Sequence, residues 1–243
     1  MSDSVAVVTG ANGGIGRETV RALLGEGRSV AAFDLMNDML DELADRSGPG
    51  RLLPIKVDVT DTAAVDDAFA QVAAAYGDPD VLVNIAGTNR VVGLAGTTDE
   101  IWDLLIDLNL KGTFLCCRAA VPYLRRRGGG RILNMSSIFG IRGEVQQVAY
   151  SASKAGVIGL TRALATELAP DGITVNALAP VMTMTPRVAA LAADHQARQL
   201  AKIPLGRYGT VADIVGTIVF LLSEAGAFYT GQTFSANGGD TMP

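Results

Sequence analysis

The sequence is poor in the residues that build metal centres and hydrolytic sites. Histidine occurs once, as His195, and cysteine twice, as the adjacent Cys116 and Cys117. One histidine without a Cys-x-x-Cys motif cannot supply the common ligand sets of zinc, so we expect no metal. A Ser-His-Asp triad would have to use His195, and no Gly-x-Ser-x-Gly turn is present to carry its serine. Metal-dependent and hydrolytic chemistries are therefore disfavoured.

Long apolar runs and a basic charge balance are also missing. No stretch reaches 18 consecutive apolar residues, so no transmembrane helix is predicted, and Met1–Ser4 lacks the basic and apolar segments of a secretory signal. The formal net charge of −5 disfavours nucleic acid or an anionic membrane as partner. The adjacent cysteines cannot form an ordinary long-range disulfide with each other. We therefore expect a reduced, cytoplasmic protein.

Short apolar runs alternate with longer helical patterns along all 243 residues, and 49% of these residues are hydrophobic. The pattern predicts an α/β fold: a doubly wound, Rossmann-type parallel sheet of about seven strands with helices on both faces. No linker, composition shift or repeat divides the chain, so we expect one domain over residues 1–243. The expected strands are Val5–Val8, Ser29–Phe33, Leu52–Val57, Val81–Asn84, Arg131–Met135, Thr174–Leu178 and Thr233–Ala236. The expected helices are Gly14–Glu26, Met36–Arg46, Thr62–Tyr76, Asp99–Arg126, Ala149–Ala169 and Val211–Leu222.

A glycine-rich turn, Thr9–Gly16, follows the first expected strand. Its glycines let the backbone turn tightly and approach a pyrophosphate, which then lies at the N-terminus of the next helix. Such a turn alone can also be an ordinary strand–helix connection. However, Asp34 closes the second strand 18 positions after Gly16, where a carboxylate can bind the adenosine ribose hydroxyls. The pair predicts a dinucleotide site.

Asp34 also bears on the choice between NAD and NADP. A carboxylate about 4 Å from a 2′-phosphate costs roughly 4 kcal/mol per charge pair at an effective dielectric near 20. Discrimination against NADP on the order of a thousandfold follows. The glycine turn holds no lysine or arginine, and Leu35 follows Asp34, so no compensating cation is expected nearby. NAD is favoured, unless Asp34 is an ordinary turn residue.

Tyr150 and Lys154 are four residues apart in a helical pattern and so share a helix face. An ammonium about 4 Å from the phenol could supply roughly 4 kcal/mol, or about three pKa units, and bring its pKa near neutrality. General acid–base catalysis is most effective there. On its own the Tyr-x-x-x-Lys spacing is common and usually marks a solvated face.

Taken together, these motifs resemble the short-chain dehydrogenase/reductase family, in its compact single-domain branch, across essentially the whole chain. The matching segments are Thr9–Gly16, Asp58-Val59, Asn84–Gly87, Asn109, Ser136-Ser137, Tyr150–Lys154, Asn176–Pro180 and Asn237–Gly239. Each segment is weak evidence alone, but their order and spacing are specific.

The resemblance implies four catalytic residues. Tyr150 would give a proton to the substrate oxygen in reduction and remove it in oxidation. Lys154 would lower the pKa of Tyr150 and hold the nicotinamide ribose. Ser137, thirteen positions before Tyr150, would bind the reacting oxygen. Asn109 would anchor a water chain from Lys154 to solvent, although a helix-interior asparagine can also simply bond local backbone.

The resemblance also implies how the cofactor is held. Asp58 would bond the adenine amine beside the Val59 backbone, Asn84–Gly87 would pass under the adenosine ribose, and residues after the sixth strand would surround the carboxamide. Val181 departs from the family's usual Pro-Gly and puts residues 181–185 in doubt, whereas Ile85 replaces a second asparagine with little consequence. The predicted cofactor-binding residues are Gly10, Asn12, Gly14, Ile15, Gly16, Asp34, Leu35, Asp58, Val59, Asn84, Ala86, Gly87, Tyr150, Lys154, Pro180, Thr183 and Thr185.

The expected function is hydride transfer between NAD(H) and a secondary alcohol or ketone. The alternatives are a 3-oxoacyl thioester reductase that uses NADPH, a non-catalytic dinucleotide-binding sensor, and lyase or epimerase chemistry on the same fold. The sequence does not name the substrate, whose recognition should depend on residues 89–92, Ile138–Val148 and the segment Thr185–Leu205. This last segment, which contains the apolar stretch Ala189–Ala193, is expected to form a mobile helical lid.

The expected helix Ala149–Ala169 carries few charges, namely Lys154, Arg162 and Glu167. A helix without a polar stripe is covered on both sides, here by a second copy related by a two-fold axis. The helix Asp99–Arg126 is its expected companion. The family resemblance adds a second interface near Thr233–Ala236 and hence a homotetramer. The alternative is a monomer with small residues exposed along the helix.

Overall fold

The computed structural model describes residues 4–36, 50–184, 188 and 193–242. The predicted helix Met36–Arg46 lies outside these residues except for Met36, and so do Thr185 and most of the predicted lid stretch Ala189–Ala193. Within the described segments, no helix combines the length and the apolar character that crossing a membrane requires.

The described residues form one seven-stranded parallel sheet in the order β3-β2-β1-β4-β5-β6-β7, which confirms the predicted fold class. Strands β1 and β2 are buried almost throughout, as expected where helices cover both faces of a parallel sheet. The strands are β1 (Val5–Thr9), β2 (Ser29–Asp34), β3 (Arg51–Lys56), β4 (Val81–Asn84), β5 (Gly130–Met135), β6 (Ile173–Leu178) and β7 (Thr233–Phe234).

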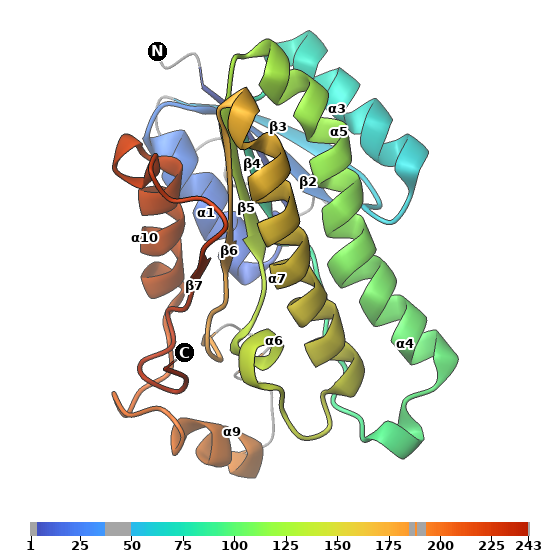
Figure 1. Ribbon diagram of the computed structural model, residues 1–243, viewed down its shortest axis with the longest axis vertical. Coiled ribbons are helices and arrows are strands. Elements are labelled where there is room, and N and C mark those ends of the chain that lie inside the picture. Colours follow the sequence, from blue (N-terminus) through green and yellow to red (C-terminus); the bar gives the residue numbers. More distant parts are fainter. Residues whose placement is uncertain (1–3, 37–49, 185–187, 189–192, 243) are drawn as a thin grey trace.

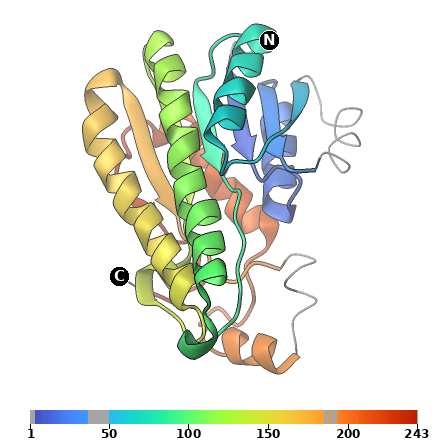
Figure 2. The same cartoon turned by 90° about the vertical axis from the view of Figure 1, so that its right-hand side faces the viewer.

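Helices cover the sheet as two layers, one on each side (Figures 1 and 2). One layer holds α1 (Gly14–Gly25) and α10 (Val211–Leu222), and the other holds α3 (Thr62–Tyr76), α5 (Gly112–Arg126) and α7 (Val148–Leu168). Local signals fix where some of these helices begin. Asp61 accepts hydrogen bonds from two amides of the first turn of α3, and Thr210 with Asp213 forms a capping box on α10.

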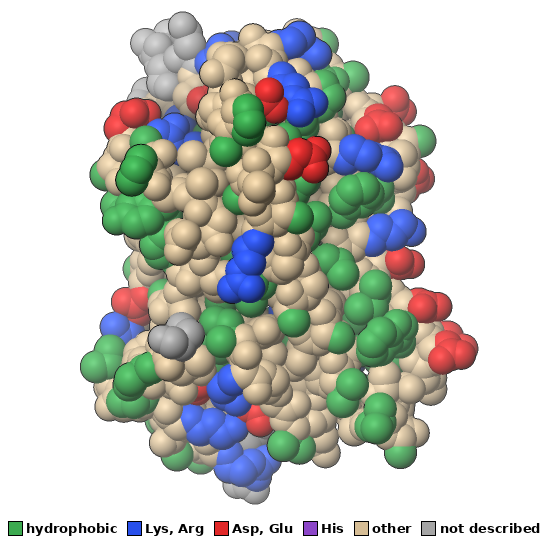
Figure 3. Space-filling model, viewed as in Figure 1, with side chains coloured by type: hydrophobic (Ala, Val, Ile, Leu, Met, Phe, Trp, Pro, Cys, Tyr) green, Lys and Arg blue, Asp and Glu red, His purple; other side chains and the backbone are tan. Residues whose placement is uncertain are grey.

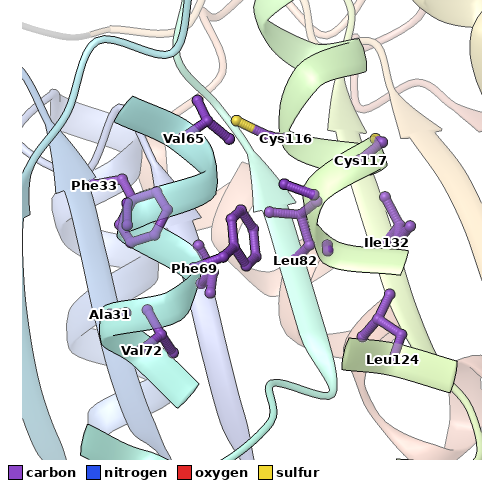
Figure 4. Close-up of a cluster of buried hydrophobic side chains, with 14 of the residues drawn as sticks. Ala31, Phe33, Val65, Phe69, Val72, Leu82, Cys116, Cys117, Leu124 and Ile132 are labelled. Carbon is purple, nitrogen blue, oxygen red and sulfur yellow. The ribbon is translucent and has the colours of Figure 1, made fainter. Parts of the chain in front are cut away.

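The core on the α3–α5–α7 side contains aromatic and sulfur-bearing side chains (Figure 4). Phe33 of β2 and Phe69 of α3 meet edge to face with ring centroids 5.4 Å apart. Cys116 and Cys117 lie in the same cluster as free, buried thiols, and burial raises the pKa of both. These cysteines therefore pack as small apolar residues.

Several element boundaries differ from the sequence prediction. The predicted helix Asp99–Arg126 is α4 (Asp99–Ile106) and α5 joined by a π-helical turn at Asp107–Lys111. The short helix α6 (Ile138–Arg142) was not predicted, α9 (Ala193–Leu200) lies within the segment Thr185–Leu205 that was expected to be helical, and β7 is two residues shorter than expected. Short 3-10 helices also occur at Leu94–Gly96, Ala169–Asp171 and Glu224–Gly226. Helices this short have weak periodicity and depend on tertiary contacts.

Strand order reverses between β1 and β4, because the chain moves from β1 outward to β2 and β3 and then returns to β4 on the other side. In open α/β sheets, ligands bind in the crevice outside the carboxyl ends of the strands at such a switch point. The loops that follow β1, β4, β5 and β6 meet at this end, near α6 in Figure 1.

Candidate active site

The glycine turn after β1 is shaped by contacts that exclude side chains. Gly10 has a φ of +65°, and a Cβ there would lie 2.7 Å from the backbone nitrogen of Ala86. A Cβ on Gly16 would lie 2.1 Å from the carbonyl oxygen of Gly10. Both positions therefore require glycine. The turn, with Asn12 and Ile15 between these glycines, leads into α1 at Gly14 and leaves the backbone open to a pyrophosphate.

Asp34 lies at the end of β2, next to this turn. Its Oδ2 accepts a hydrogen bond from the Asn12 amide at 2.9 Å, and its Oδ1 accepts one from the Met36 amide at 3.3 Å. Leu35 is half exposed. The register of β2 and β3 pairs Asp34 with Lys56, and paired residues of adjacent strands project on the same side of a sheet. Lys56 is thus a cation across the strand pair that sequence distance concealed, but its side chain forms no ion pair with Asp34 among the described residues.

The segment Asn84–Gly87 crosses from β4 toward the glycine turn. The Thr9 hydroxyl accepts hydrogen bonds from the amides of Ile85 and Ala86, both at 3.1 Å. The Asn84 side chain does not face this crevice: its Nδ2 donates to Asn134 Oδ1 at 2.9 Å inside the sheet core. A cofactor role for Asn84 is therefore limited to its backbone.

Asp58 and Val59 follow β3. The Asp58 carboxylate accepts hydrogen bonds from the amide and hydroxyl of Thr60, at 2.8 and 2.7 Å. Val59 is buried, and a Cβ on Gly112 would lie 2.9 Å from Val59 Cγ2. An adenine amine that bonds Asp58, as predicted, would therefore bind a carboxylate that already accepts two hydrogen bonds from Thr60.

A cavity of about 380 Å³ opens beyond the carboxyl ends of β4, β5 and β6. Ser137, Tyr150 and Lys154, three of the four predicted catalytic residues, all line it. Tyr150 and Lys154 come from the first two turns of α7, and Ser137 precedes α6. Predicted cofactor residues that also line the cavity are Ile15, Gly87, Pro180 and Thr183.

Lys154 is buried, and its ammonium donates a hydrogen bond to the Met135 carbonyl oxygen at 2.8 Å. Burial lowers the pKa of Lys154 to about 8, so the side chain is still mostly protonated at pH 7. Its Nζ lies 5.8 Å from the centroid of the Tyr150 ring. A charged group thus adjoins the phenol inside the cavity.

The two serines at the end of β5 have different partners. Ser137 Oγ accepts a hydrogen bond from the Phe139 amide at 3.2 Å, which caps α6 and leaves the hydroxyl proton for another acceptor. Ser136 Oγ donates to the Lys154 carbonyl at 2.8 Å and ties β5 to α7. The Tyr150 ring meets Phe139 edge to face at 6.4 Å, which fixes the ring against α6.

Asn109 is fully buried in the π-helical turn between α4 and α5. Its Oδ1 accepts from the Thr88 amide at 2.9 Å, while its Nδ2 donates to the Thr88 carbonyl and to Ser153 Oγ at 3.0 and 3.1 Å. A Cβ on Gly87 would lie 2.6 Å from this Oδ1. Asn109 therefore joins the loop after β4 to α7. Its role in a water chain stays a prediction.

The segment after β6 accommodates the unusual Val181. This valine is buried in a small cluster with Ile138, Phe139 and Ile203, and Tyr150 packs against the same cluster. Thr183 is also buried, and its hydroxyl donates to the Val181 carbonyl at 3.0 Å. Packing thus accommodates the Val181 side chain, the contacts of Pro180 and Thr183 with a carboxamide stay predictions, and the predicted Thr185 lies outside the described residues.

Sequence reasoning missed contacts that help to build the site. The Met135 carbonyl holds Lys154, and the Thr88 backbone is held by Asn109. Backbone groups carry no residue signature, so no sequence pattern could have shown either. The sequence placed Gln147 only within the substrate-recognition segment Ile138–Val148, yet it is buried and lines the cavity. Its spacing of three residues from Tyr150 was the available signal.

Comparisons with known proteins agree with this arrangement. A family model described as enoyl-(acyl carrier protein) reductase matches residues 10–241. The 3-oxoacyl-[acyl-carrier-protein] reductase FabG of Thermotoga maritima is 39% identical over 241 residues, which are 98% of each chain. The short-chain reductase protein NovJ of Streptomyces niveus is 40% identical, over 98% of this chain and 94% of its own. A solved structure from Sinorhizobium meliloti 1021, described as a candidate short-chain alcohol dehydrogenase, is 38% identical. It superposes with a TM-score of 0.92 and covers 99% of this chain and 97% of its own.

Proposed function

The chain belongs to the short-chain dehydrogenase/reductase family, and on that premise we propose that it transfers hydride between NAD(H) and a secondary alcohol or ketone. As a member of this family, it is an oxidoreductase that acts on CH–OH and C=O groups with a nicotinamide dinucleotide. The observation that carries the finer proposal is the convergence of Ser137, Tyr150 and Lys154 on one cavity beside the glycine turn.

The residues present fit a dinucleotide, because Gly10 and Gly16 permit the close turn into α1, and the N-cap residue Gly13 has no side chain that would occupy the first amides of that helix. The bound nicotinamide would supply or accept the hydride. In reduction, Ser137 donates its hydroxyl proton in a hydrogen bond to the substrate oxygen, because the Phe139 amide already occupies one of its lone pairs. Tyr150 then transfers a proton to the same oxygen, and oxidation reverses the transfer.

Lys154 supports this proton transfer from a buried position. Its ammonium is held by the Met135 carbonyl and stays next to the Tyr150 ring. A positive charge in a desolvated site stabilises the phenolate that remains when Tyr150 gives up its proton. A panel of alcohols and ketones with NAD(H) and NADP(H), followed at 340 nm, tests the whole proposal. A non-catalytic sensor would bind the dinucleotide and turn over none of them.

We propose NAD over NADP because the Asp34 carboxylate is held beside the glycine turn by two backbone amides. Lys56 lies across the strand pair but is exposed, and water screens its charge. Steady-state kinetics with both cofactors should show higher kcat/KM with NADH. Asp34→Ala should narrow the gap, and Lys56→Met should widen it. Equal or higher efficiency of the wild type with NADPH would refute this preference.

A 3-oxoacyl thioester reductase that uses NADPH is the second candidate. The observation that favours it is the name of the Thermotoga maritima relative, which is 39% identical over 98% of both chains. The Asp34 carboxylate disfavours NADPH as its cofactor, because it would repel the 2′-phosphate. The two candidates separate in one assay: acetoacetyl thioester with NADPH against simple ketones with NADH, both at saturating cofactor. A strong preference for the first pair establishes the thioester reductase.

We propose a homotetramer, with α7 and α4–α5 at one interface. Few charged side chains cover α7 in Figure 3, and Trp102, Leu104 and Phe114 are each about 40% exposed on the adjoining helices. Near β7, the fully exposed Phe228 marks the second interface. Apolar area of this kind is typical of subunit contacts. Light scattering should give about four times the 25.2 kDa monomer mass. A monomer refutes both interfaces, and a dimer removes one.

We propose a cytoplasmic location, which is inferred from the two adjacent cysteines. Cys116 and Cys117 are buried and form no disulfide among the described residues. Fractionation of the native host cells tests it.

A further inference from the structure

The short helix α6 contacts each of the three residues that line the cavity and are proposed for catalysis. Ser137 is its N-cap residue. The ring of Phe139, in its first turn, meets the Tyr150 ring edge to face with centroids 6.4 Å apart. A Cβ on Gly140 would lie 2.6 Å from the carbonyl carbon of Lys154, so α6 packs directly on the backbone of α7. The position of α6 therefore sets the relative positions of the catalytic side chains.

A helix of this length does not hold its own position. It spans only the five residues Ile138–Arg142, and short helices depend on tertiary contacts. The last residue, Arg142, makes such contacts: its guanidinium carbon lies over the Phe139 ring, 5.2 Å from the ring centroid. The cation thus packs on the same ring that meets Tyr150.

Arg142 is held in turn by two carboxylates. Its Nε donates a hydrogen bond to Asp240 Oδ1 at 2.8 Å, and its Nη1 donates one to Glu144 Oε2 at 2.9 Å. The side chains of Asp240 and Glu144 are 1% and 9% exposed. Hydrogen bonds between charged partners are stronger than neutral ones, and the planar guanidinium gives them a fixed direction. The two carboxylates therefore fix the orientation of Arg142.

The same network reaches the segment after α9. Glu144 also accepts a hydrogen bond from Lys202 Nζ at 2.6 Å. Although burial alone raises it, Lys202 and Arg142 hold the pKa of Glu144 at about 2. Ile203, the residue after Lys202, packs in one buried cluster with Phe139. Glu144 therefore stays charged at neutral pH and ties the end of α6 to this segment.

Asp240, the other anchor of Arg142, lies in a packed turn near the end of the chain. Its amide donates to the Asn237 carbonyl at 3.1 Å, and Asn237 Nδ2 donates to the Thr241 carbonyl at 2.6 Å. A Cβ on Gly239 would lie 2.9 Å from Pro204 Cγ, so the turn has a close neighbour. The C-terminal end of the chain lies beside α6 in both Figure 1 and Figure 2. The Asp240 carboxylate is therefore a fixed anchor for α6.

We propose that Arg142 and Asp240 are positioning residues for the hydride transfer. The Asp240 carboxylate holds Arg142, Arg142 holds the Phe139 ring, and this ring orients Tyr150. Neither Arg142 nor Asp240 is among the described residues that line the cavity, so the pair acts through α6 and not on the substrate. The assignment rests on the proposed function. A displacement of about 1 Å at the reacting groups can cost about a hundredfold in rate.

The test measures the single-turnover rate of NADH oxidation at saturating ketone, together with the dissociation constant of NADH by fluorescence titration. Arg142→Met removes the cation and keeps an apolar side chain of similar length. Its single-turnover rate should fall about 10- to 100-fold, while the NADH dissociation constant stays within about twofold of the wild type. Asp240→Asn keeps the shape of the anchor and removes its charge, so it should lower the rate by a smaller factor with the same unchanged NADH affinity.

Arg126 provides a matched control near the amino end of β5, at the opposite edge of the sheet from the cavity. It also donates to an aspartate, Asp78, at 2.8 and 2.9 Å, and its guanidinium carbon lies 4.5 Å from the centroid of the Tyr123 ring. Arg126→Met should leave the single-turnover rate within about twofold of the wild type, because it removes the same kind of contacts far from α6. In the Arg142→Met background, Asp240→Asn should change the rate by less than about twofold, since the two residues act through one another.

The outcomes separate a positioning role from a structural one. An unchanged single-turnover rate in Arg142→Met overturns the assignment and leaves the proposed function intact. A rate and an NADH affinity that fall together overturn it as well, because they show a general loss of the site. If Arg142→Met does not fold, Asp240→Asn decides by the same two measurements. Additive losses in the double variant show that Asp240 does not act through Arg142 and overturn the assignment. Absence of turnover by the wild type across the panel of alcohols and ketones overturns the proposed function with it.

Discussion

Replacing Lys154 with methionine should abolish catalysis and at the same time stabilise the fold at neutral pH. Lys154 is buried, and burial lowers its pKa from 10.5 to about 8. The folded protein therefore holds a charge at pH 7 that its surroundings disfavour. Methionine has a similar length, carries no charge and is apolar. The ammonium is thus retained for its chemistry at a cost in stability.

The magnitude follows from the difference between the folded and unfolded pKa. At pH 7 the charged form costs about 3 kcal/mol, because the pKa falls from 10.5 to about 8 and each pKa unit corresponds to about 1.4 kcal/mol. Methionine also removes the hydrogen bond to the Met135 carbonyl, a loss of about 1–3 kcal/mol. The net gain for Lys154→Met should therefore be about 1–2 kcal/mol at pH 7.

The pH dependence identifies the cause. Between pH 8 and 10.5 the unfolded chain keeps the Lys154 proton and the folded protein releases it, so wild-type stability rises with pH in this window. The variant has no such contribution. The stability advantage of the variant should shrink by about 2–3 kcal/mol between pH 7 and pH 10 and can change sign.

Urea unfolding followed by circular dichroism, at one protein concentration and at pH 7, 8, 9 and 10, measures this difference. Groups that titrate in both proteins cancel in the comparison. A stability difference that stays constant across this range would refute the argument, because it would mean that the Lys154 ammonium is not desolvated in the folded protein.

Three further predictions concern neighbouring residues. Tyr150→Phe keeps the ring contact with α6 and should lower kcat by about 10²–10⁴-fold with NADH binding unchanged by fluorescence titration; more than a tenth of wild-type kcat would contradict its acid–base role. Gly87→Ala places a Cβ 2.6 Å from Asn109 Oδ1 and should lower the melting temperature by several degrees, as overpacking costs about 1–3 kcal/mol. Gln146→Gly relieves a positive φ and should raise the free energy of unfolding by up to about 1 kcal/mol. A drop in calorimetric stability for Gln146→Gly would show that the conformation is not strained.

Hydrophobic periodicity and the turn-forming residues between apolar runs determined the sheet and most of its helices, and the motifs determined the family. The apolar runs of β1, β2 and β4 are continuous because both faces of a parallel sheet are buried. The residue types alone therefore indicate that these strands are buried. The glycine turn was equally readable, since Gly10 and Gly16 hold positions where a Cβ would collide with backbone. Signals of this kind are local, and a single chain displays them.

Tertiary structure alone decided how side chains pair across distance. The register of β2 and β3 brings Lys56 beside Asp34, 22 positions away. Asn109 lies in a π-helical turn, in what the sequence suggested was one regular helix, and its carboxamide bonds Thr88 and Ser153. These pairings depend on strand order and helix packing, which no local pattern of residues encodes. The same is true of Gln147, whose burial beside the cavity becomes visible only when the loop, α7 and the cavity wall are placed together.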